Sequence, residues 1–528
     1  LVIDGKLKGQ NMDSDNGTID GRLAVKGDNI SPLLTALGQK DLAKSVKTLN
    51  VDAGIKGTMT DVTFSPLSVV AAVKGTGRKK LVNLTLKAGA ARANLDQETL
   101  AVKELSLKGL GMNITGHLNA SKIKTEPVFN GKLNVPNFNL KNVLINLNQK
   151  LPRMADPKAL TKFGLSTEFK GTKKSIALNK LTMRLDRSTL KGDLAIANFE
   201  GPDVRFGLGV DQLNADHYLP PKPKGKGRPV TPEAAAAGAA QLPIATLRKV
   251  KIKGDLLVGK LQISGAKMQN VKLSINAAGG RISVNPVAAS LYKGSYNGII
   301  HLDATKKRPA LTFNTKLTGV QIEPLLFDTT GDRSLSGIAN LTANLKSTGN
   351  NSTVIKKGLT GPLKFLVQNG VYRGMDVAAM LQQLEVMIES KRPGSIRKGG
   401  ETRFQTLAGT INFKNGVGAN SDLLLDGSGF KITGKGIVAN LHNNTMKYDA
   451  KVSVDASSTQ RGESNYNLGG YEVPIRCRGK IGADACKPDV GDIVEEIAKA
   501  TVQKEIGKKL EKAIGGDAGK ALKELFKF

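Results

Sequence analysis

The 528-residue chain is poor in the side chains that usually carry out catalysis. It has no tryptophan, two cysteines and four histidines, His117, His217, His301 and His442, and aromatic residues make up 4% of it. None of the histidines has the ligand or triad spacing typical of a metal site or a nucleophilic site. We therefore expect a non-enzymatic protein that uses no cofactor and no metal.

Acidic residues are also scarce relative to basic ones. There are 45 Asp+Glu against 78 Lys+Arg, which gives a formal charge of +33, and 59 of the basic residues are lysine. A nucleic-acid-binding protein usually combines arginine with stacking aromatic residues, and neither is abundant here. We therefore predict no nucleic-acid partner. The excess charge would instead attract phosphate headgroups at short range.

Long hydrophobic runs are missing as well. No stretch reaches the 18 or more consecutive apolar residues that a membrane-spanning helix requires. The chain begins at Leu1, and residues 1–7 already have the pattern of a strand. We expect that an N-terminal segment, such as a signal or membrane anchor, is absent from this chain.

The strongest positive signal is a hydrophobic period of two residues. Leu311, Phe313 and Leu317 alternate with polar residues, and similar runs recur along the chain. Gly, Asn and Asp interrupt these runs about every 8 to 12 residues, as hairpin turns do. This pattern predicts a mostly β fold, built as a long, twisted antiparallel sheet.

A second signal is an imperfect internal repeat in which a strand is followed by a short apolar helix. Copies begin near residues 23, 133, 208 and 315. Because their spacing is irregular, they indicate duplicated β modules with short capping helices rather than a strict solenoid.

Composition divides the chain into four regions. Residues 1–218 hold the N-terminal β modules, and residues 219–245 are a Pro-, Lys- and Ala-rich stretch typical of a flexible linker or loop. Residues 246–487 form a second β region. Residues 488–528 show apolar positions four or five apart, which predicts an amphipathic helix. Its ordinary role would be to pack on the end of the sheet, and the alternative is that it binds a membrane surface.

The two cysteines, Cys477 and Cys486, lie nine residues apart without a third cysteine or a nearby histidine. This spacing does not fit a zinc site. In an oxidising compartment the pair would form a disulfide, whereas in a reducing cytosol both would remain thiols. The sequence leaves this choice open.

Several runs in the second half resemble the C-terminal region of the bacterial AsmA family. The most specific is Gly361 to Leu381, with an Asn-Gly-Val-Tyr-Arg-Gly-Met-Asp core, and it is joined by the runs 317–345 and 404–454. The resemblance covers about residues 285–510. It implies a periplasmic protein tethered to the inner membrane by an N-terminal segment and involved in outer-membrane lipid homeostasis and assembly.

The resemblance also implies a bridge-like lipid-transfer architecture, in which a curved sheet offers an apolar groove to acyl chains. Its partners would be phospholipid or lipopolysaccharide, bacterial membranes and another envelope protein. The candidate groove residues are Leu311, Phe313, Leu317, Phe365 and Val367. The alternative is a structural or chaperone-like factor for outer-membrane protein assembly that acts through free strand edges.

Overall fold

The computed structural model describes most of the chain in two compact units. The described residues are 2–11, 17–221, 241–390, 399–454 and 472–489, except for gaps at 37, 40–42, 44, 75–80, 148, 150 and 482–484, together with 491, 495 and 499. Unit 1 contains described residues up to Ala289, and unit 2 contains those from Ser290 onward together with 241–242. The predicted linker core, 222–240, and nearly all of the predicted C-terminal helix lie outside the described residues.

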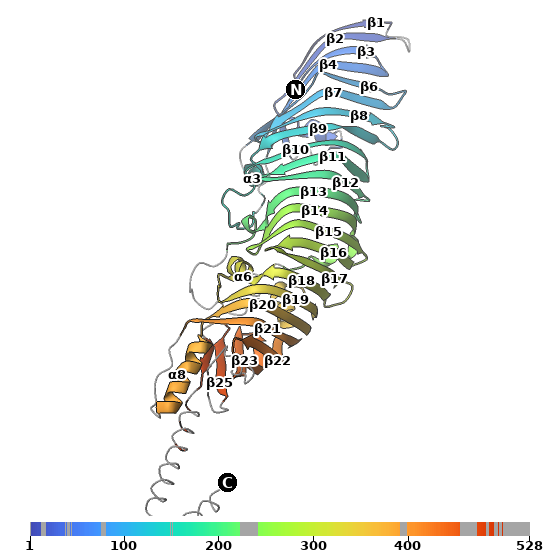
Figure 1. The fold of residues 1–528 in the computed structure, drawn as a ribbon. Coiled ribbons are helices and arrows are strands. Elements are labelled where there is room, and N and C mark those ends of the chain that lie inside the picture. The colour runs from blue at the N-terminus through green and yellow to red at the C-terminus, as the bar shows by residue number, and fades with distance from the viewer. Residues whose placement is uncertain are drawn as a thin grey trace, which may run out of the picture. The chain divides into compact units, whose positions relative to one another are not determined.

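Unit 1 is a ladder of strands in chain order (Figure 1). Its strands are β1 (Val2–Gln10), β2 (Thr18–Gly27), β3 (Val46–Thr58), β4 (Asp61–Lys74), β5 (Leu81–Ala88), β6 (Ala90–Asn94), β7 (Thr99–Gly109), β8 (Met112–Ser121), β9 (Val128–Phe138), β10 (Phe163–Thr172), β11 (Ser175–Leu185), β12 (Ser188–Ala197), β13 (Asp203–Asn214), β14 (Lys251–Ile263) and β15 (Ala266–Ala278). Its helices are α1 (Ser31–Ala36), α3 (Leu140–Asn146), the 3₁₀ turn η1 (Ala215–His217) and α5 (Ile244–Lys249). Strand β16 (Arg281–Leu291) carries the boundary between the units.

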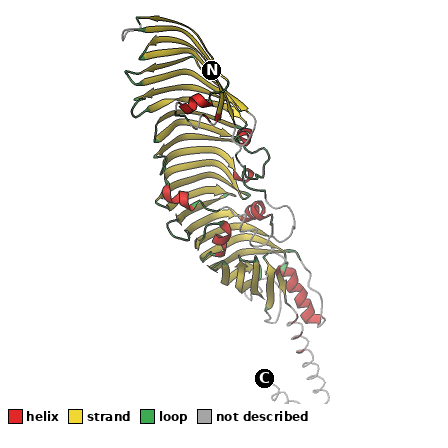
Figure 2. Cartoon of the chain, turned by 180° about the vertical axis from the view of Figure 1, so that it is seen from behind, coloured by secondary structure: helices red, strands yellow, loops and turns green. Residues whose placement is uncertain are grey.

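Unit 2 repeats this plan and adds a longer helix. Its strands are β17 (Gly294–Asp303), β18 (Ala310–Gln321), β19 (Leu335–Thr348), β20 (Gly361–Arg373), β21 (Glu401–Lys414), β22 (Val417–Gly427), β23 (Phe430–Asn440), β24 (Thr445–Val454), β25 (Val473–Lys480) and β26 (Cys486–Pro488). Its helices are α6 (Ile322–Thr330), α7 (Ser352–Lys357) and α8 (Val377–Ser390). Within each unit the strands form a curved layer, with the helices at strand ends (Figure 2).

The prediction of a mostly β, antiparallel fold is confirmed, with one exception in unit 1. Strands β13 and β14 pair in parallel, with Leu208 opposite Leu256. A parallel pair cannot be joined by a hairpin and needs a long return connection. Residues 215–250 supply that connection, which gives the predicted linker a topological role. The same pairing places β14 and β15 in unit 1, although the sequence had grouped them with the region 246–487.

The predicted strand-then-helix repeat is confirmed by the structure. Helices α1, α3 and η1 follow β2, β9 and β13, and antiparallel pairing brings the ends of these three strands to one edge of unit 1. Asparagine starts two of the turns: the side chains of Asn139 and Asn214 accept hydrogen bonds from the backbone N–H groups of Asn142 and Asp216. Short polar side chains favour this position because they satisfy amide groups that the first helical turn leaves unpaired.

One carboxylate, Asp186, holds together the loops at this edge. It accepts hydrogen bonds from the backbone N–H groups of Leu160, Thr161 and Lys162 and from the hydroxyl of Tyr218, at 2.8 to 3.1 Å. Partial burial of the Asp186 carboxyl raises its pKa, but these donors outweigh burial, so the pKa lies below its usual value. The charged form therefore stabilises the folded state.

We expect this stabilisation to be complete above the unfolded-state pKa of about 3.9 and to be lost as the pH falls through the lower folded-state pKa. Asp186→Asn should therefore lower the melting temperature at neutral pH, and the deficit should shrink below about pH 4. Melting curves of wild type and variant between pH 3 and 7 would test this. A deficit that does not vary with pH would show that the charge of Asp186 is not what matters.

Candidate functional site

The most prominent feature of the sheet is that one of its two faces is apolar in every strand of unit 1. Residues directly opposite one another in neighbouring strands share a face, so the face can be followed from strand to strand. Leu194 lies opposite Phe206, Leu208 opposite Leu256, and Leu256 opposite Leu273. We call this surface the apolar face. Over β12–β15 it comprises Leu190, Leu194, Ile196, Val204, Phe206, Leu208, Val210, Ile252, Leu256, Val258, Val271, Leu273 and Ile275.

The large side chains of this face are mostly half-buried rather than sealed. Of the residues of β12–β15 just given, only Val258 and Val271, each 3% exposed, are buried. Small residues of the same face are buried instead, such as Ala53, Ala88 and Ala120, at 2 to 4% exposure. Larger neighbours shield the alanines, while their own outer surfaces stay accessible. Over these strands the described residues provide no second layer like that of a sandwich core.

In unit 2, all five predicted groove residues lie on one face. Leu311, Phe313 and Leu317 are half-buried, while the alternating residues 312, 314 and 316 are exposed. Register connects the two predicted groups, because Leu317 lies opposite Leu341, which lies opposite Phe365. Val367 lies two residues further along the same strand. The structure therefore brings together residues from β18 and β20, and their contact with lipid stays a prediction.

The apolar face of unit 2 is covered at its C-terminal end. Helix α8 contributes Val377, Met380, Leu381, Leu384 and Met387 to a buried cluster with the apolar-face residues Val367, Phe404, Leu425, Phe430, Ile432, Val452 and Val473. Met380, Leu381 and Leu384 are at most 1% exposed. Val367 is thus part of a sealed core at 5% exposure, whereas Phe365 is half-buried. The covering role of α8 was not apparent from the sequence, although the apolar spacing of 377–387 could have signalled it.

Aromatic rings on the apolar face lie over glycines of the neighbouring strand. A Cβ atom added at Gly254 would lie 2.6 Å from Cγ of Phe206, and one added at Gly131 would lie 2.9 Å from Cζ of Phe169. Phe365 has the same relation to Gly409, at 3.0 Å from Cζ. Because these rings occupy the space that a side chain would need, they lie low on the sheet. The few large aromatic residues therefore keep the apolar face smooth.

We expect Gly254→Ala to destabilise unit 1 by about 1 to 3 kcal/mol, because the new methyl group must displace the Phe206 ring and the facing backbone. Gly207→Ala is the matched control, since a Cβ at Gly207 meets nothing within 4 Å. Urea denaturation of both variants would measure the difference. Equal losses would mean that the ring does not occupy the space over Gly254.

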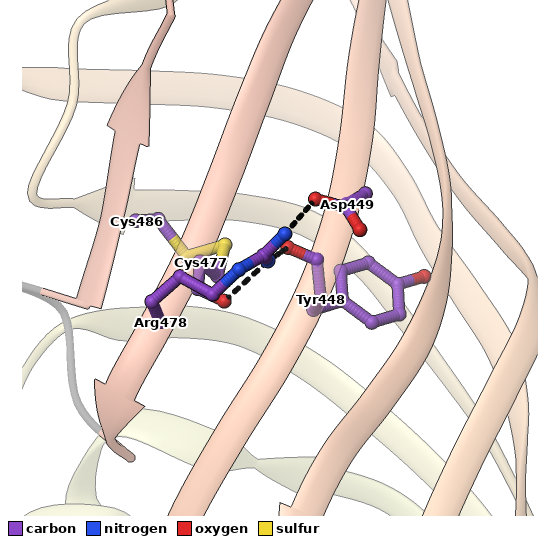
Figure 3. Close-up of a disulfide and its surroundings, with 5 residues drawn as sticks. All are labelled: Tyr448, Asp449, Cys477, Arg478 and Cys486. Atoms are coloured by element: carbon purple, nitrogen blue, oxygen red, sulfur yellow. Dashed lines mark hydrogen bonds and ion pairs between the residues drawn. A yellow bond between two sulfur atoms is a disulfide. The ribbon is translucent and has the colours of Figure 1, made fainter.

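The two cysteines lie at the end of unit 2, where they join β25 to the short strand β26. Cys477 and Cys486 are cross-strand partners linked by a disulfide (Figure 3). Cys477 is 4% exposed. Beside them, the Arg478 guanidinium donates hydrogen bonds to the carbonyl groups of Tyr448 and Cys477 and pairs with Asp449. The redox state of the pair in the cell stays a prediction.

If the protein resides in an oxidising compartment, Cys477 and Cys486 of native protein should react with a thiol label only after a reductant is added. The double variant Cys477→Ser/Cys486→Ser should lose about 2 to 3 kcal/mol, the loop-closure contribution of a bridge between residues nine apart. Mass spectrometry of labelled protein and thermal melting would test both parts. Immediate labelling of both thiols would place the protein in a reducing environment.

Catalytic groupings do not emerge from the described residues. No set of three or more His, Cys, Asp or Glu side chains in the described part of the chain could hold a metal ion. Nδ1 of His217 lies 3.3 Å from a carboxylate oxygen of Asp156, and the His442 ring forms a hydrogen bond with the carbonyl of Asn415 at 2.7 Å. Both contacts connect loops to their surroundings. Within the described residues, no helix has the length and hydrophobicity needed to cross a bilayer.

Comparisons with known proteins agree with the resemblance and extend it. The model of the AsmA family matches residues 6–423, more than three quarters of the chain. The match begins far N-terminal of residue 285, where the sequence resemblance had started, and it stops before 424–510. Protein AsmA of Escherichia coli (strain K12) is 22% identical over an alignment of 330 residues, which covers 58% of this chain and 51% of that protein. The chain thus spans about half the length of this curated relative.

No solved structure matches the chain significantly. The family assignment depends on the family model, which covers more than half of the chain, and the relative agrees with it. On these grounds the chain belongs to the AsmA family.

Proposed function

We propose that this chain is a non-enzymatic periplasmic protein that binds lipids and transfers them between bacterial membranes, in outer-membrane lipid homeostasis and assembly. The observation that carries this proposal is the apolar face, which is continuous through the strands of unit 1, is found again in unit 2, and is left half-exposed. A sheet with one apolar face must cover it with another layer, with itself or with a ligand. Acyl chains are the ligand that such a surface accepts.

The size of the hydrophobic effect explains why a continuous surface is needed. An acyl chain of about 16 methylenes costs on the order of 13 kcal/mol to move into water, at roughly 0.8 kcal/mol per methylene. An isolated apolar pocket would lower this barrier at a single point. A face that continues from strand to strand lowers it along the whole path, and the rings that lie over Gly131 and Gly254 add little height to that face.

The curvature of the strands supports a groove. Side chains on the concave side of a bent sheet approach one another, whereas those on the convex side spread apart. The apolar residues are the more buried set, and the polar residues between them, such as Thr312 and Asn314, are exposed. We therefore place the apolar face on the concave side, with α8 closing the groove over β20–β25.

Replacing Phe313 with Glu should separate a groove from a sealed core. In a groove the carboxylate stays hydrated when no lipid is present, so Phe313→Glu should fold normally and bind less lipid. Leu381→Glu would bury a charge under α8 and should unfold this part of unit 2, at a cost of several kcal/mol. Asn314→Glu, on the polar face, should change neither property.

Circular dichroism, melting curves and mass spectrometry of co-purified lipids would measure these effects. Normal lipid content in the folded Phe313→Glu variant would remove this part of the apolar face from the lipid path. Unfolding of that variant would show that Phe313 belongs to a sealed core.

The alternative, a structural or chaperone-like factor for outer-membrane protein assembly, has one supporting observation. Among the described strands, β1 pairs only with β2, and all of its residues are exposed, including Ile3 at 64% and Leu7 at 51%. A free strand edge of this kind can receive a strand of another protein. Purified protein that carries no lipid and captures unfolded outer-membrane protein would favour this alternative.

A further inference from the structure

We propose that one edge of unit 2 binds the anionic phosphate headgroups of the lipids whose acyl chains lie on the apolar face. This inference rests on the proposed function and adds a headgroup class and a position. The edge is the one at which β17, β19, β21 and β23 end, and we call it the basic edge. Its segments are 303–309, 346–360, 412–417, 440–447 and 479–481.

Backbone hydrogen bonds join these segments into one row. The N–H of Gly349 donates to the carbonyl of Pro309, that of Gly416 to Leu359, and that of Leu441 to Gly416, at 2.8 to 2.9 Å. Ile481 continues the row by donating to Asn444 at 3.2 Å. The turns are therefore neighbours in space, and their side chains form one surface.

The charge of this row is almost entirely positive. It carries Lys306, Lys307, Arg308, Lys346, Lys356, Lys357, Lys414, Lys447 and Lys480, and all except Lys357 are exposed. Asp303 is the single acidic residue in the same segments, and it pairs with Lys306 at 3.8 Å. Lys307, Arg308, Lys356 and Lys414 form no ion pair with any other described residue. Uncompensated charges of one sign in a row repel each other, which favours an anionic ligand between them.

The opposite edge of unit 2 shows that this arrangement is not a general consequence of a basic chain. There Glu323 pairs with Arg333 at 3.9 Å and with Arg373 at 3.5 Å, and Arg373 also pairs with Glu401 at 3.1 Å. Asp328 accepts a hydrogen bond from the Tyr292 hydroxyl. Arg333 and Arg373 at that edge thus have carboxylate partners, whereas the four cations of the basic edge have none among the described residues.

Helix stability accounts for only part of the basic edge. Lys356 and Lys357 lie in the last turn of α7, where a cation interacts favourably with the helix dipole. Lys307, Arg308 and Lys414 lie in turns or at the end of a strand and have no such partner. A phosphate ligand accounts for the lysines of α7 and for the cations that lie outside that helix.

The geometry suits a lipid that lies across the edge. Phe313 and Leu345 are cross-strand partners on the apolar face, and Lys346, next to Leu345, is directed to the other face near the end of β19. An acyl chain on the apolar face would thus bring its headgroup to the end of these strands. There the lysine and arginine side chains could reach the phosphate.

The test uses the quadruple variant Lys307→Gln/Arg308→Gln/Lys356→Gln/Lys414→Gln in the full chain. The control is Lys132→Gln/Lys170→Gln/Lys191→Gln/Lys253→Gln, which removes the same charge from exposed strand positions of unit 1. Tail-labelled phosphatidylglycerol or phosphatidylcholine would be offered in vesicles, and lipid taken up by the protein would be counted. Co-sedimentation with the vesicles would measure surface binding separately.

Wild type and control should take up phosphatidylglycerol in preference to phosphatidylcholine. The basic-edge variant should lose at least about fivefold of that preference, the contribution of one lysine beside anionic headgroups, while phosphatidylcholine uptake stays unchanged. The preference should weaken as salt shortens the screening length below about 10 Å.

A basic-edge variant that keeps the preference, or a control that loses it equally, would overturn the proposal while leaving lipid binding in place. A variant that loses only vesicle co-sedimentation would show that the edge binds a bilayer surface rather than a carried lipid. Uptake of neither lipid by wild type would overturn the proposed function, and this inference with it.

Discussion

The structure depends on one constraint, which is that a sheet with a single apolar face has to keep that face away from water. Over β12–β15 most of its large side chains stay half-exposed in the described part of the chain, whereas over β20–β25 helix α8 covers it and forms a sealed core. The same pattern of strands therefore leaves apolar side chains half-exposed in unit 1 and buries them under a helix in unit 2. The difference between them comes from one helix and not from the strands.

Glycine has an unusual part in this arrangement. A glycine within a strand normally weakens it, because it adds no packing and has more freedom to lose on folding. Here Gly131, Gly254 and Gly409 each lie beneath an aromatic ring of the adjacent strand, which recovers buried area at those positions. Such pairs reconcile a high glycine content with a stable sheet.

Much of the fold could be predicted from the sequence because its signals are local. Alternation of apolar and polar residues predicted the strands, and the imperfect repeat predicted the short helical segments after β9 and β13. The five predicted groove residues do share a face, since a period of two leaves no other choice for Leu311, Phe313 and Leu317.

The rest depended on tertiary contacts that no local pattern encodes. The burial of Val367 is determined by α8, which is formed by residues at least ten positions later in the chain. The parallel pairing of β13 with β14 could not be read from either strand alone. The basic edge was also hidden, because its cations come from turns that are separated in sequence and meet only when the strands are in register.

The parallel pair also affects how many strands can be added to such a sheet. Adding a hairpin inserts two strands and returns the chain to the edge it left. A crossover such as residues 215–250 carries the chain back to its starting edge, so an odd number of strands can be inserted without reversing the direction of those that follow. Neighbouring strands lie about 4.8 Å apart. The dimension of a sheet across its strands can therefore change by one strand spacing at a time, whereas hairpin insertion changes it by two.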